Sequence, residues 1–280
     1  MSMAYKYCNT KGVDILNNLE LLVRPPNQFN DPFEFTPRII AQNPNRKTKE
    51  LLKSREYIEF LHTRWRAHGR FNGSLREFRK YVRAHRREMA NEMLPEFPLA
   101  IAQAQRGVLD EVSKTYGVLC FSNRRDSILM WGHYCDKHCG LVVGFDESNA
   151  VFHPTNGREL RPVNYVRERV VFDATWKDSD PRLLSFELSM VFSKNEDWRY
   201  EGEMRQLLQL FPLRKELLDD GSLGYFLPIP PSAFVSVTLG AKCSIELEEK
   251  VRSALTQPRL SHVTLDHAVL HDSEFALRFV

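Results

Sequence analysis

The residues best suited to chemistry lie in the stretch WRYEGEMRQLLQL, which begins at Trp198 and ends at Leu210. Glu201 and Glu203 are two positions apart, and Arg205 follows after two more. In a β-strand these three side chains share one face, where two carboxylates about 7 Å apart repel each other and need a cation or water. Such a pair can hold a substrate hydroxyl, stabilise a developing cation or take a proton from an acceptor. The alternative is a solvated edge strand in which Arg205 bridges a glutamate.

A second candidate lies in the stretch CFSNRRDSILMWGHYCDKHCGLVVGF. Trp131 and Tyr134 are three residues apart, so on a short helix their rings share one face. There they could sandwich a flat ring, or they could pack in the core as ordinary apolar groups. The same stretch holds metal-capable side chains, but their spacing, H-x-C-x-x-H-C, matches no zinc pattern. We therefore predict no metal site.

A third candidate is the loop NQFNDPFEF, residues 27–35. Turn-forming residues dominate it, so we expect a compact loop. Asn30 and Asp31 precede Pro32, which leaves two polar side chains either to cap the turn or to line a pocket.

One segment carries a strong positive charge. From Arg46 to Glu88 there are 14 Lys or Arg and 5 Asp or Glu, a local balance of +9. The whole chain carries +3, which leaves −6 for the remainder. Between Arg46 and Arg87 aromatic side chains are interleaved with the basic ones, a mixture suited to phosphate contact and base stacking. Nucleic acid is therefore a candidate partner, and the alternative is a solvated helical face.

The chemistry-bearing residues need elements that position them. We predict strands at 4–8, 20–23, 117–122, 140–145, 163–171, 207–211, 225–227, 234–239 and 260–265. We predict short helices at 13–19 and 128–135, a helical stretch over 47–94 broken at 69–73, and another helix at 99–112. The pattern indicates an α+β fold in a single domain, with a β core at 1–40 and 116–280 and a basic helical insertion at 45–115.

Composition excludes several classes of protein. No apolar run approaches the roughly 18 residues that a membrane helix needs. The opening residues, MSMAYKYCNT, contain no apolar leader segment, and five scattered cysteines fit a reducing compartment. We therefore expect a cytoplasmic protein without a membrane partner. The sequence also lacks a glycine-rich phosphate loop, a nucleophile elbow and an H-E-x-x-H motif.

Three blocks together resemble a widespread prokaryotic family of unknown function. They are YKYCNTKGVDILNNLELLVRPPNQFNDPFEF, LCFSNRRDSILMWGHYCDKHCGLVVGF and FSKNEDWRYEGEMRQLL. The shared pattern is Y-K-Y at the start, F-N-D-P-F-E in the first loop, C-F-S and W-x-H-Y in the middle, and W-x-Y-E-x-E-x-R late in the chain.

The order of these blocks also resembles the ADP-ribosyltransferase fold, which implies a split antiparallel β core. Those enzymes open with a strand that carries His or Arg, and Lys6 stands at the matching position. Their middle block is a strand with Tyr or Ser, matched by Ser122, then a short helix with an aromatic residue and an apolar strand. Their last block is a glutamate that opens a strand, and it matches Glu201 and Glu203.

The resemblance implies that NAD is the substrate and that the bond between ribose and nicotinamide is broken. Glu203 would hold the ribose hydroxyl and stabilise the developing cation, and Glu201 would orient or deprotonate the acceptor. Tyr134, with Trp131, would stack on the nicotinamide ring. The remaining residues of the predicted NAD site are Lys6, Tyr7, Asn30, Asp31, Ser122 and Arg205.

We expect a mono-ADP-ribosyltransferase-like protein, a toxin or phage-defence effector that modifies nucleic acid or protein. Two alternatives stay open. One is a non-catalytic nucleic-acid-binding module that uses the helices from Arg46 to Arg87. The other is a hydrolase that acts on NAD or on another nucleotide.

Overall fold

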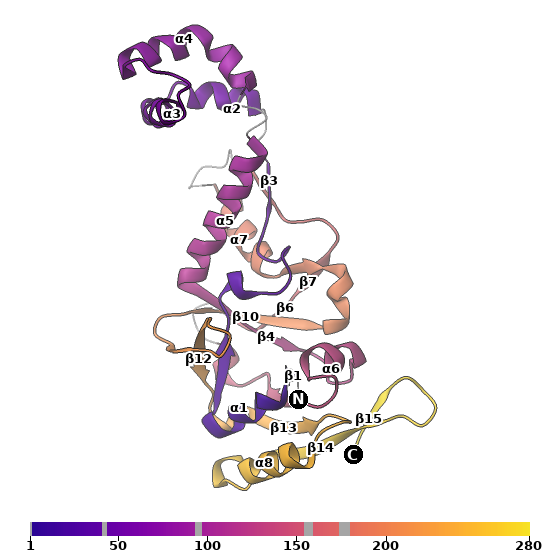
Figure 1. The fold of residues 1–280 in the computed structure, drawn as a ribbon. Helices are drawn as coiled ribbons and strands as arrows, with labels where there is room; N and C mark the ends of the chain where they lie inside the picture. The colour runs from indigo at the N-terminus through magenta and orange to yellow at the C-terminus, as the bar shows by residue number, and fades with distance from the viewer. Residues whose placement is uncertain (1, 41–43, 93–96, 154–158, 174–179) are drawn as a thin grey trace. The chain divides into compact units, whose positions relative to one another are not determined.

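The computed structural model describes residues 2–40, 44–92, 97–153, 159–173 and 180–280. The chain divides into two compact units, and Figure 1 traces it from end to end. Unit 1 comprises Met1–Thr36, Leu109–Arg169 and Glu187–Val280, and unit 2 comprises Pro37–Val108 and Val170–Phe186.

Unit 1 is built on an eight-stranded sheet with the order β15-β14-β13-β5-β1-β4-β10-β6. Its strands are β1 (Met3–Cys8), β4 (Tyr116–Ser122), β5 (Leu141–Asp146), β6 (Arg161–Pro162), β10 (Glu203–Gln209), β13 (Phe234–Leu239), β14 (Thr264–Leu270) and β15 (Leu277–Phe279). Neighbouring strands pair antiparallel except β13 and β14, which run parallel. The α+β class is confirmed, and the sheet is mixed, because the antiparallel pairing that the resemblance implies holds for its neighbouring strands except β13 and β14.

The first elements follow the predicted order. β1 is followed by α1 (Val13–Asn18) and β2 (Glu20–Val23). The helix ends because Leu19 adopts a left-handed conformation, φ 53°, and its backbone N–H donates to the Ile15 carbonyl. This tight reversal lets the chain pass directly from the helix into β2.

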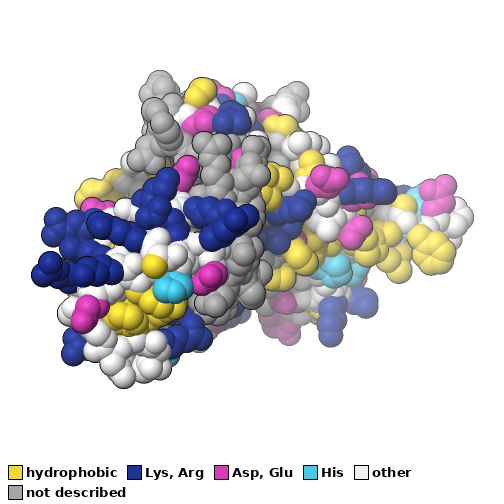
Figure 2. Space-filling view, turned by 90° about the horizontal axis from the view of Figure 1, so that it is seen from above, with side chains coloured by type: hydrophobic (Ala, Val, Ile, Leu, Met, Phe, Trp, Pro, Cys, Tyr) yellow, Lys and Arg dark blue, Asp and Glu magenta, His cyan; other side chains and the backbone are white. Residues whose placement is uncertain are grey.

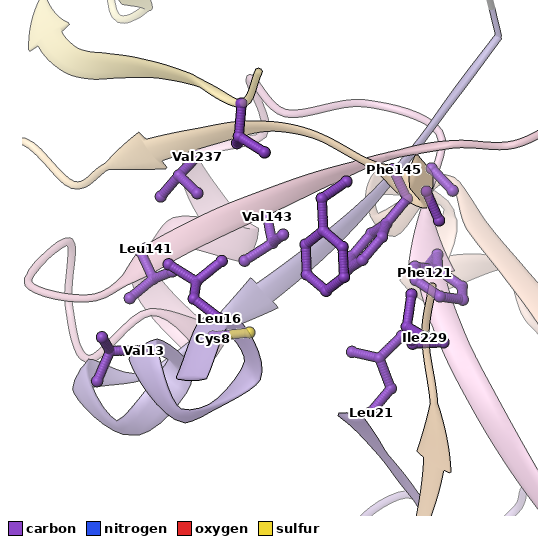
Figure 3. Packing of buried hydrophobic residues seen from close by; sticks show 14 of the residues in the cluster. Cys8, Val13, Leu16, Leu21, Phe121, Leu141, Val143, Phe145, Ile229 and Val237 are labelled. Carbon is purple, nitrogen blue, oxygen red and sulfur yellow. The ribbon is translucent and has the colours of Figure 1, made fainter. Parts of the chain in front are cut away.

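One face of the large sheet carries the main apolar core. Leu141, Val143 and Phe145 of β5 pack there with Leu16 of α1, and all four side chains are fully buried (Figure 3). Helix α8 (Ile245–Leu255) adds Leu247, Val251 and Ala254 to the same cluster and packs beside α1. The alternation of β5 side chains between two covered faces explains its continuous apolar sequence.

The opposite face of the sheet is covered by α6 (Ile128–Tyr134). Tyr7, Trp131 and Val142 form the centre of a second apolar cluster on that side. Ser127 caps α6, because its Oγ accepts a hydrogen bond from the Met130 backbone N–H. The cap fixes where the helix begins, and so fixes the direction of Tyr134 at its end.

Several predicted strands differ in extent from the observed ones. The stretch 163–171 divides into β7 (Asn164–Val166) and β8 (Val171–Asp173), and β10 begins four residues before the predicted 207. β7 pairs in parallel with β9 (Ser193–Asn195), and β8 pairs in parallel with β3 (Arg38–Ile40). A three-stranded sheet joins β2, β12 (Leu223–Pro228) and β11 (Arg214–Leu217). Helix α7 (Arg182–Val191) precedes β9.

Unit 2 contains α2 (Pro44–Leu51), α3 (Arg55–Ala67), α4 (Leu75–Glu92) and most of α5 (Phe97–Thr115). The predicted break at 69–73 is confirmed, and a second break before Ser54 makes α2 a separate helix. Ser54 caps α3, since its Oγ accepts from the Tyr57 backbone N–H. Leu61, Phe78 and Val82 lie at the centre of a small apolar core between the helices. The insertion at 45–115 is therefore helical, as predicted.

Across the described ranges, no helix combines the length and the apolar character that crossing a membrane requires.

Candidate active site

The two glutamates of the E-G-E sequence lie on different elements. Glu201 ends a 3₁₀ helix (Glu196–Glu201), and Glu203 opens β10. Gly202 between them has φ +50°, and a Cβ there would lie 2.2 Å from Asn123 Oδ1. Glycine is therefore required at this reversal. The expectation that Glu201 continues one strand with Glu203 and Arg205 was wrong.

Lys194 nevertheless brings the two carboxylates together. Its Nζ donates to Glu201 Oε2 at 2.6 Å and to Glu203 Oε2 at 3.0 Å. The lysine lies on β9, directly opposite Tyr165 of β7. The Tyr165 hydroxyl accepts a hydrogen bond from the Glu203 backbone N–H at 2.7 Å. The pairing of β7 with β9 thus positions both the Lys194 ammonium group and the start of β10.

Arg205 holds Glu203 from the other side. Its Nε donates to Glu203 Oε1 at 2.7 Å and its Nη2 donates to Oε2 at 3.0 Å, a bidentate pair. Arg205 Nη1 donates to the Val191 carbonyl at 2.8 Å. The guanidinium is fully buried, and the rings of Phe29 and Phe35 lie 5.6 and 5.1 Å from its centre.

A third carboxylate, Glu34, completes the cluster. One of its oxygens accepts from Arg205 Nη2, and its Oε1 lies 3.4 Å from Lys194 Nζ without a hydrogen-bond partner in the described part of the chain. We call the group formed by Glu34, Lys194, Glu201, Glu203 and Arg205 the buried ion cluster. Each of its five side chains is at most 5% exposed.

The buried ion cluster contains three carboxyl groups and two cations, Lys194 and Arg205. Burial acts to raise the pKa of Glu203, but Arg205 and Lys194 overcome it and lower that pKa to about 2. Burial dominates at Glu34 and raises its pKa despite the same two cations. Glu203 is therefore ionised at neutral pH, and Glu34 is the member that takes up a proton more readily.

Tyr134 connects α6 to the cluster. Its hydroxyl donates to Glu201 Oε1 at 2.6 Å, and its ring is half-buried. Burial and the adjacent Glu201 raise its pKa, so the hydroxyl stays protonated and keeps donating. Trp198 and Tyr200 are also half-buried, and Lys194 Nζ lies 4.9 Å from the Trp198 ring. These rings form an aromatic border beside the acidic pair.

Ser122 lies directly opposite Glu203 in the pairing of β4 with β10. Its Oγ donates to the Glu201 backbone carbonyl at 2.5 Å. The predicted serine is thus next to both glutamates, where it positions the backbone between them. The fold brings five of the predicted site residues together: Ser122, Tyr134, Glu201, Glu203 and Arg205.

Lys6 lies on the other face of the sheet. Its neighbour Tyr5 is paired with Ser122, and paired residues share a face, so Lys6 points away from Glu203. Lys6 Nζ instead donates to the Cys120 carbonyl at 2.8 Å and lies 5.9 Å from the centre of the Phe121 ring. The fold does not place Lys6 with the glutamates.

Tyr7 and Trp131 are core residues. Trp131 is fully buried, its Nε1–H donates to the Arg125 carbonyl at 2.8 Å, and its ring meets that of Tyr7 edge-on. The Tyr7 hydroxyl donates to the Arg124 carbonyl at 3.1 Å. Of the two aromatic residues predicted on α6, only Tyr134 has exposed ring surface beside the acidic pair.

The FNDPFEF loop contributes through a residue that the sequence did not single out. Asn30 is exposed, and Asp31 caps the turn by accepting from the Phe33 backbone N–H at 2.9 Å. Glu34, three residues later, reaches the cluster. The sequence signal for Glu34 was its position between Phe33 and Phe35. An ionised side chain among apolar neighbours is buried only when it has a charged or hydrogen-bonding partner.

Lys194 and Tyr165 were also missed. Lys194 falls inside the quoted FSKNEDWRYEGEMRQLL block, but nothing in its spacing indicates burial. Tyr165 comes from a separate strand and carries no sequence signal. In the described ranges, no group of three or more His, Cys, Asp or Glu side chains could hold a metal ion.

Comparison with known proteins identifies one related family. Residues 130–206 match the model of a family described as "Protein of unknown function (DUF2971)". The matched segment begins on α6 and ends just after Arg205, so it includes Tyr134 and four of the five cluster residues. No curated protein and no solved structure matches the chain.

Proposed function

We propose that the acidic pair is the reaction centre of an ADP-ribosyltransferase-like enzyme whose substrate is NAD. The observation that carries this proposal is that Glu201 and Glu203 share Lys194 at 2.6 and 3.0 Å within a buried cluster of three carboxyl groups and two cations. Two further features support it. The strands β1, β4 and β10, which carry the three resembling blocks, are neighbours in one sheet, and the Tyr134 hydroxyl is bonded to Glu201.

The proposed reaction breaks the C–N bond between ribose and nicotinamide. The bonding electrons leave with nicotinamide, which departs as a neutral molecule, and the ribosyl carbon becomes cation-like, as in glycoside hydrolysis. A nucleophilic acceptor then forms the new bond to that carbon, and its proton passes to a base. Negative charge held beside the developing cation lowers the barrier.

The two glutamates suit different roles in this scheme. A carboxylate with a pKa of about 2 is a weak base, so Glu203 acts as a fixed anion that stabilises the ribosyl cation. Arg205 and Lys194 hold it in place. Glu201 accepts hydrogen bonds from one tyrosine and one lysine, and it receives the proton of the acceptor. Tyr134 presents its half-buried ring to the nicotinamide.

The decisive experiment measures nicotinamide release from NAD labelled in the nicotinamide ring, with nucleic acid or protein added as acceptor. Glu203→Gln preserves the shape of the side chain and removes the charge, and it should lower the rate about a hundredfold. Glu249→Gln, at an exposed position on α8, is the matched control and should keep the wild-type rate. Circular dichroism of each variant separates loss of activity from loss of fold.

Two results would refute the proposal. One is an intact NAD pool after incubation of the wild type with every acceptor class. The other is a folded Glu203→Gln variant that releases nicotinamide at the wild-type rate. Free ADP-ribose as the sole second product would instead identify a hydrolase that transfers the ribosyl group to water. The toxin or phage-defence role stays a prediction.

A further inference from the structure

A second feature lies in unit 2, on helix α4. Phe78 and Val82 lie on one side of this helix and are fully buried against the other helices. The opposite side of the helix is exposed and carries three cations, Arg76, Lys80 and Arg83. They are four and three residues apart, so they form one row along the helix. We call these three residues the basic row. The helix is kinked at His85, beyond the end of the row.

The basic row is not neutralised within the described residues. None of its three cations forms an ion pair with a described carboxylate, whereas nearby acids are already engaged. Glu59 of α3 binds both Arg55 and Arg79, at 3.1 and 2.5 Å. Figure 2 shows Lys and Arg side chains gathered over the helical unit, with few acidic side chains among them.

Glu77, the remaining acid of the first turn of α4, serves as a helix cap. Its Oε2 accepts from the backbone N–H and the hydroxyl of Ser74, each at 2.7 Å, and Ser74 Oγ accepts from the Glu77 backbone N–H at 3.3 Å. This reciprocal arrangement is a capping box, and it fixes the start of the helix. The start of the helix is therefore fixed at the end from which the row of cations begins to extend along it.

We propose that the basic row binds the phosphate backbone of a nucleic acid. Seven residues of α-helix span about 10 Å, the axial length of about three nucleotides along one strand. Three evenly spaced cations therefore match a linear chain of phosphates. An anionic membrane is a poorer match, because a surface-binding helix inserts its apolar side, and here Phe78 and Val82 are already buried. This inference does not depend on the proposed NAD chemistry.

The test uses fluorescently labelled 20-nucleotide probes of single-stranded DNA, single-stranded RNA and duplex DNA, titrated by anisotropy between 50 and 200 mM NaCl. Three phosphate contacts predict a log–log salt slope of at least about −2 on single strands and about −2.7 on duplex DNA. The triple variant Arg76→Gln, Lys80→Gln, Arg83→Gln should bind about tenfold more weakly or worse, with the slope reduced by about 2 on single strands.

The matched control removes three exposed lysines of unit 1, as Lys215→Gln, Lys242→Gln and Lys250→Gln. It changes the net charge equally and should bind nearly as the wild type does. Equal losses in the two triple variants would mean that total charge alone governs binding, and would overturn the proposal. So would an unchanged salt slope in the α4 variant, or binding to phosphatidylserine vesicles or poly-glutamate as tight as to the oligonucleotides.

Discussion

Tyr134 donates a hydrogen bond of 2.6 Å to Glu201 across a sequence separation of 67 residues. This contact ties the end of α6 to the turn that precedes β10. It places an aromatic ring with exposed surface beside a carboxylate that shares its lysine with Glu203. The resemblance to ADP-ribosyltransferases implies that Tyr134, Glu201 and Glu203 belong to one site. Mutation of the residues in this contact can test that expectation.

Removing the hydroxyl of Tyr134 should affect the chemical step more than substrate binding. Tyr134→Phe keeps the ring but leaves Glu201 Oε1 without its donor, so we expect kcat for nicotinamide release to fall about tenfold with little change in KM. Tyr134→Ala also removes the stacking surface and should raise KM. Tyr225→Phe on β12 is the matched control. A Tyr134→Phe enzyme with unaltered kcat would contradict the assigned role of the hydroxyl.

Lys194 should be essential for stability. Lys194→Met leaves three buried carboxylates with Arg205 as their only cation, and breaking a buried ion pair from one side costs about 3–5 kcal/mol. Urea unfolding measures the loss, and Lys250→Met, at an exposed position on α8, should change the free energy of unfolding by about 0.5 kcal/mol or less. Coincident unfolding curves for Lys194→Met and wild type would mean that the cluster contributes nothing through this lysine.

Glu203 should give the protein a specific acid sensitivity. Because its folded pKa lies near 2, below the ordinary value of 4.5, its ionisation stabilises the folded state above pH 4.5. That contribution is lost as the pH falls from 4.5 to about 2, and it amounts to on the order of 3 kcal/mol. The free energy of unfolding should therefore decline more steeply in wild type than in Glu203→Gln between pH 5 and 2. Parallel declines, measured by urea unfolding at each pH, would exclude the lowered pKa.

Lys6→Met should have little effect on catalysis. The resemblance to ADP-ribosyltransferases placed Lys6 in the NAD site, but its side chain lies on the sheet face opposite Glu203. We expect kcat/KM for NAD to stay within about threefold of wild type and the free energy of unfolding to fall by about 1 kcal/mol, since the bond to the Cys120 carbonyl is lost. A large rise in KM for NAD would contradict this prediction and would show that Lys6 takes part in NAD binding.

Trp131 should act through stability alone. Trp131→Phe leaves a cavity in the apolar cluster beneath α6 and removes the donor to the Arg125 carbonyl, so we expect a loss of about 2–3 kcal/mol. Thermal unfolding measures that loss. KM for NAD, measured well below the melting temperature, should match wild type. A raised KM would instead support direct stacking of the indole on the nicotinamide ring.

Local pattern predicted the strands and helices well where one periodicity dominates. β1, α1, β2, β4, α6 and β13 lie close to their predicted positions, because each has short-range signals such as apolar alternation or a cap like Ser127. The prediction of one strand at 163–171 failed because three charged residues, Arg167, Glu168 and Arg169, interrupt the apolar ones, and the chain bends there between β7 and β8. Likewise, only the pairing register reveals that β13 and β14 run parallel.

The sequence by itself determined which residue types are available: an E-G-E pair, an aromatic residue at the end of a short helix and a basic helical segment. Only the tertiary structure decided which of them meet. Ser122 shares a sheet face with Glu203, and so does Tyr5, which pairs with Ser122. Lys6 is one position further along the strand and therefore points to the other face. Glu34 lies beside the acidic pair, and three buried carboxyl groups require cations such as Lys194 at hydrogen-bonding distance. No local pattern in a sequence encodes that pairing.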